Sequence, residues 1–515
     1  MKNGFLKALG YDPIEKQTSI RTELIAGVVT FLAMAYILTV NPNQIFGAGS
    51  VYWASAFIAT ALGAIIGTLL MAFVAKMPLA QASGMGLNSM LGGMIGGWGG
   101  YGLFTPGQAF MLVLISGLLF LVLSLIKING KTFRELVFDG MPTAVRTSIS
   151  VGIGLFIAYI GFQNAGIIVT NNYTQVGLVD FTNWGSQVIN NGDLFATDLE
   201  GIAVWNPLTG EAAKTAVVAF AGLFLIAILD KLKVKGSVIL GIVGATLIGI
   251  PLGVTDLSIL AGKGDISWKF WENFANFFSG ENSVFVSFAD SFKDGVIPEG
   301  GTIFTVIMVV ITLCMIDMFD TMGTIVGCCS GNRVLSDENN KPYNYGKIMI
   351  SDAIATCTGA VLGTSTVTTF VESGAGVSAG GRTGLTAFTT ASLFFASMFA
   401  LPVFAAIPSA AAASALIYVG VLMMKNNIKN IDMKDAIGAT SAFLTIVVML
   451  LSYSITKGIG IGLVTYTVMS AIAYLIGVIK YAIDKKEKPV WNVSVVALIV
   501  TALFCVYFFV PVTLF

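Results

Sequence analysis

The sequence predicts an all-α integral membrane protein, and three observations lead to this fold class. Of its 515 residues, 56% are hydrophobic and only 11% are charged, whereas a soluble protein carries about 25% charged residues. Apolar stretches recur that are long enough to cross a bilayer, which takes about 20 residues in a helix. Basic clusters follow only some of these stretches, a pattern typical of the cytoplasmic loops of a multi-pass protein.

Hydropathy predicts fourteen membrane segments. Twelve of them read as continuous helices: 24–40, 54–74, 109–126, 147–169, 214–229, 238–254, 304–319, 348–362, 385–400, 409–424, 436–452 and 460–479. The third and tenth segments, 78–95 and 364–377, are interrupted by glycine and polar residues. A further charge-free run, 490–515, is either a fifteenth span or a helix that lies in the membrane interface.

The distribution of charge predicts the orientation of the chain. Basic clusters follow the fourth, sixth, eighth, twelfth and fourteenth segments, which all end on one side of the membrane. The long loop 170–213 has no lysine or arginine, and the less clear loop 255–301 mixes both signs. The positive-inside rule therefore predicts a cytoplasmic N-terminus, both long loops outside, and a multi-pass protein of the plasma (inner) membrane. The polar first 20 residues do not resemble a signal peptide.

Composition excludes several classes of function. A formal net charge of zero argues against a nucleic-acid partner. The absence of histidine removes the commonest metal ligand and the usual proton carrier near neutral pH. The five cysteines have no CxxC spacing and are expected to be buried small apolar residues. We therefore expect no metal, no cofactor, no catalytic residue and no enzymatic activity.

The two interrupted segments, QASGMGLNSM and TTFVESGAGV, indicate an internal repeat. Each follows, two segments later, a span with polar groups, Thr30–Tyr36 in the first half and Asp317–Thr324 in the second. The spacing is 58 residues from Thr30 to Asn88 and 55 from Asp317 to Glu372. Two halves of seven segments have opposite orientations, which is the inverted repeat found in many transporters, with the substrate site at the broken helices.

Three carboxylates and one amide are the candidate functional groups. A charge at the centre of a membrane helix costs roughly 2.5–3.5 kcal/mol, so Asp317, Asp320 and Glu372 are expected to face a cavity. Carboxylates and the amide of Asn88 suit a neutral, planar solute with N–H donors. Structural alternatives stay open: Asp320 at a helix end, Asn88 in an interhelical hydrogen bond, and Phe370 in packing.

Four long motifs resemble the AzgA-like purine permeases of the nucleobase/ascorbate transporter superfamily. They are RTELIAGVVTFLAMAYILTVNP, ASGMGLNSM, DMFDTMGTIVG and GTSTVTTFVESGAGVSAGGRTGLTA. The resemblance implies the uracil-permease fold, with fourteen segments in two inverted repeats and a short strand in each interrupted segment. It implies a core domain formed by 1–137 and 302–404, a gate domain formed by 138–257 and 405–482, and leaves 483–515 as an apolar tail.

The resemblance also implies an activity: proton-coupled import of hypoxanthine, guanine or adenine by an elevator-type movement of core against gate. The implied substrate-binding residues are Asn88, Asp317, Glu372, Val371, Phe370 and Gly86, and the implied proton-coupling residues are Asp317, Asp320 and Glu372. A homodimer is compatible with the fold class. Ser83 and Ser89 replace the proline and alanine of the usual motif, which affects the expected base preference. The alternatives are an anion transporter of the same fold and a channel.

Overall fold

The computed structural model of the chain is mostly helical. It describes residues 2–47, 49–96, 102–128, 131–132, 140–171, 175–179, 181, 195–197, 203–205, 210–234, 236–261, 266–298, 303–329, 332–336, 342–452, 455–484, 488 and 490–509. Within these residues, eight helices are long and apolar enough to cross a membrane, and four shorter apolar helices accompany them. The prediction of a mostly helical, multi-pass membrane protein is confirmed.

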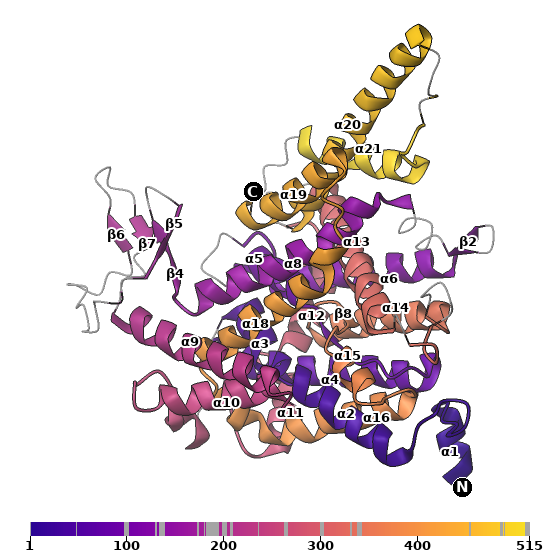
Figure 1. The fold of residues 1–515 in the computed structure, drawn as a ribbon. Helices are drawn as coiled ribbons and strands as arrows, with labels where there is room; N and C mark the ends of the chain where they lie inside the picture. Colours follow the sequence, from indigo (N-terminus) through magenta and orange to yellow (C-terminus); the bar gives the residue numbers. More distant parts are fainter. Residues whose placement is uncertain are drawn as a thin grey trace.

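The elements alternate long helices with short connections (Figure 1). The first half contains α1 (Lys2–Ala8), α2 (Ile20–Met34), α3 (Ile37–Phe46), α4 (Trp53–Leu70), η1 (Met71–Ala75), β1 (Gln81–Ser83), α5 (Met85–Ile95), α6 (Pro106–Leu125), β2 (Lys127–Ile128), β3 (Lys131–Thr132), α8 (Thr143–Asn164), β4 (Ile168–Asn171), β5 (Gln175–Leu178), β6 (Phe195–Thr197), β7 (Ala203–Trp205), α9 (Gly210–Lys231) and α10 (Ser237–Gly249).

The second half begins with three short elements, η2 (Leu257–Ala261), α11 (Phe270–Ser279) and α12 (Val284–Asp294). The remaining elements are α13 (Ile303–Cys329), α14 (Tyr345–Leu362), β8 (Val367–Thr369), α15 (Ser373–Ser378), α16 (Gly384–Ser397), η3 (Met398–Ala400), α17 (Leu401–Ala405), α18 (Ser409–Asn427), η4 (Ile428–Asn430), α19 (Ala436–Leu451), α20 (Ile455–Asp484) and α21 (Val495–Phe509).

Helix contacts sort the membrane elements into two groups. In the first group, α2–α6 pack with α13–α17, and in the second, α8–α10 pack with α18–α21. Small residues permit the close approach of α8 and α18, because a Cβ atom on Gly420 would lie 2.3 Å from the carbonyl oxygen of Gly154. The groups meet where α3, α5 and α13 contact α8 and α18, and where α2 contacts α10.

The two interrupted segments cross each other inside the first group. β1 pairs with β8 antiparallel, with Gln81 opposite Thr369 and Ser83 opposite Val367. Every residue of both strands is buried. Backbone bonds continue on both sides of the pair, from Phe370 N to Ala80 O and from Gly84 N to Thr366 O. A non-helical backbone inside a membrane survives only where protein satisfies its polar groups, and each strand does this for the other.

The first membrane segment differs from its prediction. It runs from Ile20 to Phe46 rather than over 24–40, and it is interrupted at Ala35 and Tyr36 between α2 and α3. Pro42 lies inside α3 and lacks the N–H group that would bond to the carbonyl of Leu38. Ala35 and Tyr36 keep right-handed helical dihedral angles, so α2 and α3 form one irregular span. The Tyr36 side chain of this span lies beside the tenth segment, where it contacts Glu372.

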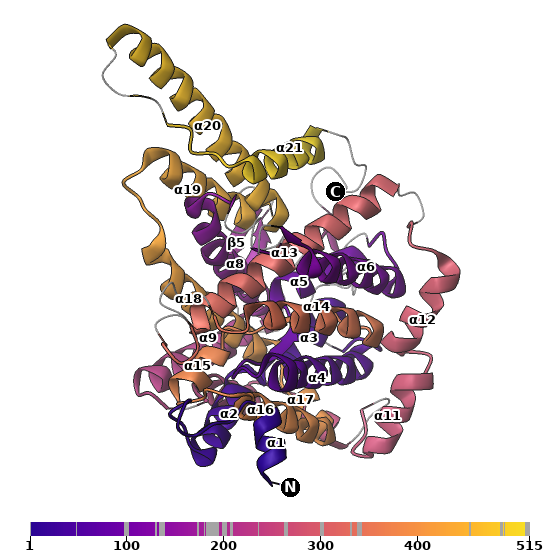
Figure 2. The same cartoon turned by 90° about the vertical axis from the view of Figure 1, so that its right-hand side faces the viewer.

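Amphipathic helices occupy the long loop before α13. The aromatic patch WKFWENFANFF forms α11, and α12 follows it. α12 packs on α4, α6 and α14, and α11 packs on α4, along one side of the molecule (Figure 2). The charge-free C-terminal run contains α21, which packs on α20. Most of the expected outer loop 170–213 and residues 510–515 lie outside the described residues.

Candidate functional site

Glu372 lies in the turn between β8 and α15, where the tenth segment is interrupted. Its side chain is buried, with 8% of the residue exposed. The Tyr36 hydroxyl donates a hydrogen bond of 2.5 Å to Glu372 Oε1. The other oxygen, Oε2, is buried and has no hydrogen-bond partner among the described residues. Burying a carboxylate oxygen without a hydrogen-bond donor costs free energy. A donor supplied by a ligand would therefore stabilise Oε2.

A small cavity adjoins this carboxylate. Its volume is about 20 Å³, which is room for about one water molecule and too little for an organic solute. The lining residues are Gly84, Met85, Gly86, Ile157, Asp320, Thr324, Thr368, Thr369, Phe370, Val371, Glu372 and Met423. All polar side chains of the lining belong to α13, β8 and the turn after β8, whereas α8 and α18 contribute only Ile157 and Met423.

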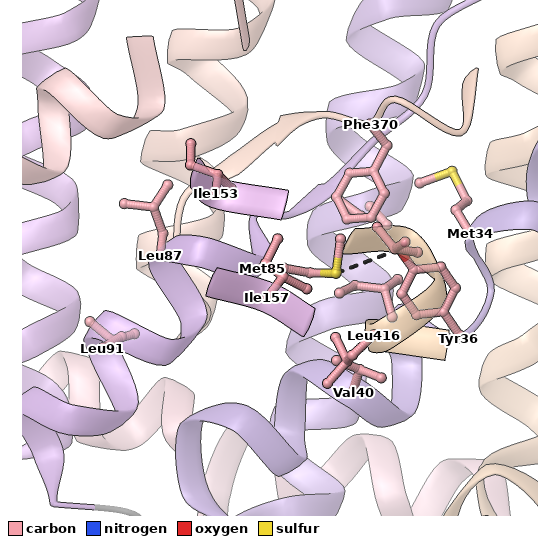
Figure 3. Close-up of a cluster of buried hydrophobic side chains, with 14 of the residues drawn as sticks. Met34, Tyr36, Val40, Met85, Leu87, Leu91, Ile153, Ile157, Phe370 and Leu416 are labelled. Carbon is pink, nitrogen blue, oxygen red and sulfur yellow. Dashed lines mark hydrogen bonds between the residues drawn. The ribbon is translucent and has the colours of Figure 1, made fainter. Parts of the chain in front are cut away.

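Apolar side chains surround the cavity where the two helix groups meet. Figure 3 shows Met85, Phe370 and Tyr36 of the first group together with Ile157 and Leu416 of the second group. The Tyr36 hydroxyl also lies 3.5 Å from the Met85 sulfur. The cavity therefore has one polar wall and one apolar wall, and the apolar wall offers no hydrogen bond that would hold a solute.

The two aspartates of α13 have different surroundings. Asp317 is fully buried and accepts a hydrogen bond of 3.0 Å from the Thr356 hydroxyl of α14. Asp320, three residues later, is partly exposed and lines the cavity. The structure thus brings Asp320 and Glu372 to one cavity and places Asp317 behind its wall.

Asn88 lies away from the cavity and is engaged within the protein. Its amide donates to Gln44 Oε1 at 3.3 Å, and its carbonyl oxygen accepts from the Ser365 hydroxyl. Glu372 is the third residue after β8, and the third residue after β1 is Gly86 rather than Asn88. Of the six expected substrate-binding residues, four therefore line the cavity: Gly86, Phe370, Val371 and Glu372.

Sequence reasoning missed the buried carboxylate of Asp352 in α14. It accepts hydrogen bonds from Gln81 Nε2 at 2.8 Å and from the Thr321 hydroxyl at 2.9 Å. These contacts join α14 to β1 and α13, directly behind the crossed strands. The signal was present, because Asp352 falls inside the predicted span 348–362 and an intramembrane carboxylate is a candidate functional group by default.

Replacing Asp352 with leucine is expected to lower the stability of the protein. The variant leaves the donors of Gln81 and Thr321 buried without their acceptor, at about 1–3 kcal/mol for each group. The measurement is the melting temperature of the detergent-purified protein, which should fall by several degrees. Asp290→Asn, at an exposed carboxylate of α12, is the matched control and should melt like the parent; equal melting of the Asp352 variant would contradict the assignment.

Glu23 is a second buried carboxylate that sequence reasoning missed. It accepts hydrogen bonds from the backbone N–H groups of Arg382 and Thr383 at 3.0 and 3.3 Å, and from the Thr386 hydroxyl at 2.6 Å. The guanidinium of Arg382 donates to the carbonyls of Val377 and Gly381. These bonds fix the loop between α15 and α16 to α2, and so hold the C-terminal end of the tenth segment in place.

Comparison with known proteins gives consistent matches over most of the chain. A family model described as the Permease family matches residues 21–190 and 208–461. The chain is 35% identical over 459 residues to the guanine/hypoxanthine permease PbuO of Bacillus subtilis, covering 89% of this chain and 93% of that protein. It is 33% identical over 461 residues to the adenine permease AdeP of Escherichia coli, covering 88% of each.

Solved structures with a similar fold are more distant in sequence. The transmembrane domain of the cyanobacterium bicarbonate transporter BicA superposes with a TM-score of 0.54 at 16% identity, over 85% of this chain and 96% of that chain. The structure of SLC26A9, which is described as an anion transporter, superposes with a TM-score of 0.55 at 10% identity, over 92% of this chain and 69% of that chain. At these identities, the likeness shows a shared fold.

Proposed function

Because this chain belongs to the Permease family, and is a transport protein rather than an enzyme, we propose that it imports purine nucleobases together with protons. The candidate substrates are hypoxanthine, guanine and adenine, the bases named for its relatives PbuO and AdeP. The observation that carries the proposal is the buried Glu372 Oε2, which adjoins a cavity and has no hydrogen-bond partner among the described residues. Purines carry ring N–H groups that would supply the missing donor.

The cavity lining suggests a role for each residue. The cavity must widen to admit a base, since its present volume of about 20 Å³ holds only a water molecule. In that wider state Glu372 accepts an N–H group of the base, the backbone of Val371 contacts its edge, and the Phe370 ring packs on its face. Gly86 leaves room for the close approach of the base. Asn88 acts through the backbone turn at Gly84–Gly86, because both ends of its amide are already engaged.

Proton coupling is assigned to carboxylates, since the chain has no histidine. Asp320 and Glu372 share the cavity, so a proton can bind beside the base. Asp317 lies three residues before Asp320 on α13, on the same helix face. In this proposal, Asp320 and Glu372 bind the transported proton and Asp317 extends the pathway behind them.

The two helix groups suggest the mechanism of transport. We assign the first group to a core domain, 1–137 and 302–404, and the second to a gate domain, 138–257 and 405–482, with fourteen segments in an inverted repeat. The polar lining of the cavity comes from the core, and the gate supplies Ile157 and Met423. A solute bound only to the core moves with it, so an elevator-type movement past an apolar gate fits this division. We also propose that the N-terminus lies in the cytoplasm and that the protein resides in the inner membrane.

The proposal is tested by uptake of labelled hypoxanthine into cells that lack their own purine permeases. Expression of this chain should give accumulation that an uncoupler abolishes and that unlabelled adenine or guanine competes with. A channel would equilibrate the base without responding to the uncoupler. An anion transporter would move bicarbonate or another anion and leave hypoxanthine outside; either result would overturn the proposal.

A further inference from the structure

The strongest unassigned contact of the site is the hydrogen bond between Tyr36 and Glu372. Tyr36 is 1% exposed and lies at the irregular turn between α2 and α3. Its hydroxyl is 2.5 Å from Glu372 Oε1 and 3.5 Å from the Met85 sulfur. A phenol has a single hydrogen to donate, and the shorter distance to a carboxylate oxygen assigns that hydrogen to Glu372.

A second cavity lies two helical turns along the chain from Tyr36. A larger cavity of about 600 Å³ is lined by Asn43 of α3 and Ser409 of α18, among other residues. Tyr36 precedes Asn43 by two helical turns, and Leu416 follows Ser409 by the same interval. Figure 3 shows Tyr36, Val40 and Leu416 close together.

Resting on the proposed function, we infer that Tyr36 is a positioning residue for purine recognition. A carboxylate can rotate and present either oxygen, which weakens its preference for a donor in one direction. The Tyr36 hydroxyl holds Oε1 on the side of α3, and this leaves Oε2 as the oxygen that accepts an N–H group of the base. The buried ring of Tyr36 has few rotatable bonds, so the restraint on Glu372 is rigid.

The inference predicts a loss of discrimination in Tyr36→Phe, which keeps the ring and removes the hydroxyl. The probes are hypoxanthine and its N-methylated derivatives, whose binding to the purified full-length protein is measured by calorimetry. The parent should bind worst the derivative that lacks the recognised N–H group. In Tyr36→Phe, hypoxanthine should bind roughly tenfold more weakly, since a hydrogen bond to a charged group is lost. The Kd of the derivative that the parent binds worst, divided by the Kd of hypoxanthine, should fall by a similar factor.

Tyr52→Phe is the matched control, because Tyr52 stacks on Phe46 and makes no hydroxyl contact with Glu372. It should keep the Kd values and the ratio of the parent. If Tyr36→Phe keeps both as well, the inference is overturned. If it weakens every derivative equally and also lowers the melting temperature, Tyr36 is only a packing residue and the inference is again wrong. If the parent itself binds no purine, the proposed function fails, a result that is distinct from the other two.

Discussion

Replacing Glu372 with glutamine is expected to reduce the accumulation of hypoxanthine at least 100-fold, close to the level of cells without the protein. The amide has one acceptor oxygen and an NH₂ group in place of two acceptor oxygens. It therefore loses either the bond from the Tyr36 hydroxyl, 2.5 Å in the parent, or the proposed bond from the base. Hydrogen bonds to charged groups are worth about 1.5–3 kcal/mol, and the variant also removes a proposed proton carrier.

The measurement is initial uptake of labelled hypoxanthine, normalised to the amount of protein at the cell surface. Glu281→Gln, at an exposed carboxylate in the loop between α11 and α12, is the matched control and should transport like the parent. Glu372→Asp keeps the charge but withdraws it by one methylene, so an intermediate rate is expected. Uptake at the parent rate by Glu372→Gln, with normal surface expression, would remove Glu372 from the site.

The sequence predicts the tenth segment well because its signals are local. Glycine and hydroxyl residues around Glu372 indicate a helix break, and the structure has a strand and a short helix there. The residue that donates a hydrogen bond to that carboxylate is not predicted. Tyr36 is 336 residues away in the chain, and the polar groups noted over Thr30–Tyr36 do not indicate which residue its hydroxyl contacts. The contact joins two segments that are distant in the chain, and hydropathy along the chain does not detect such a contact.

The pairing of the two halves shows a second limit. Spacing along the chain suggests Asn88 as the counterpart of Glu372, but the strand register assigns that position to Gly86. An error of two residues moves a side chain from the cavity into the interior, because consecutive residues of a helix point in different directions. Counting between motifs locates a segment to within a turn, whereas hydrogen-bonded register locates a side chain.

The buried carboxylate of Asp352 was missed for a related reason. The helix around Asp352 is apolar enough to be read as an ordinary span. That reading ignores the free-energy cost of burying the carboxylate of Asp352. Its hydrogen-bond donors, Gln81 and Thr321, come from elements far apart in the chain, so no local sequence motif predicts these contacts. The three-dimensional arrangement gives this residue a structural role behind the crossed strands, distinct from the cavity-lining role proposed for Glu372.

If the proposed core domain moves past the proposed gate domain during transport, a disulfide between the two should stop transport. An ideal Cβ atom at Gly236, at the start of α10, lies 3.1 Å from the Cβ atom of Leu32 in α2. Disulfides need Cβ atoms about 3.5–4.5 Å apart, so a small shift permits the bond. The pair Leu32→Cys and Gly236→Cys is made in a background without the five native cysteines.

Oxidation of this pair should reduce hypoxanthine uptake to background, and a reductant should restore it, because the core can no longer move past the gate. Each single cysteine should be insensitive to oxidation; the Gly236 variant also reports the cost of a side chain at its positive φ of 78°. The matched control pair, Thr467→Cys and Thr501→Cys, joins α20 to α21 inside one group, where the two hydroxyl oxygens are 2.9 Å apart. Its oxidation should leave uptake unchanged. Undiminished uptake after complete formation of the Leu32–Gly236 bond would show that α2 and α10 keep their contact throughout the cycle, and the division into a moving core and a fixed gate would be wrong.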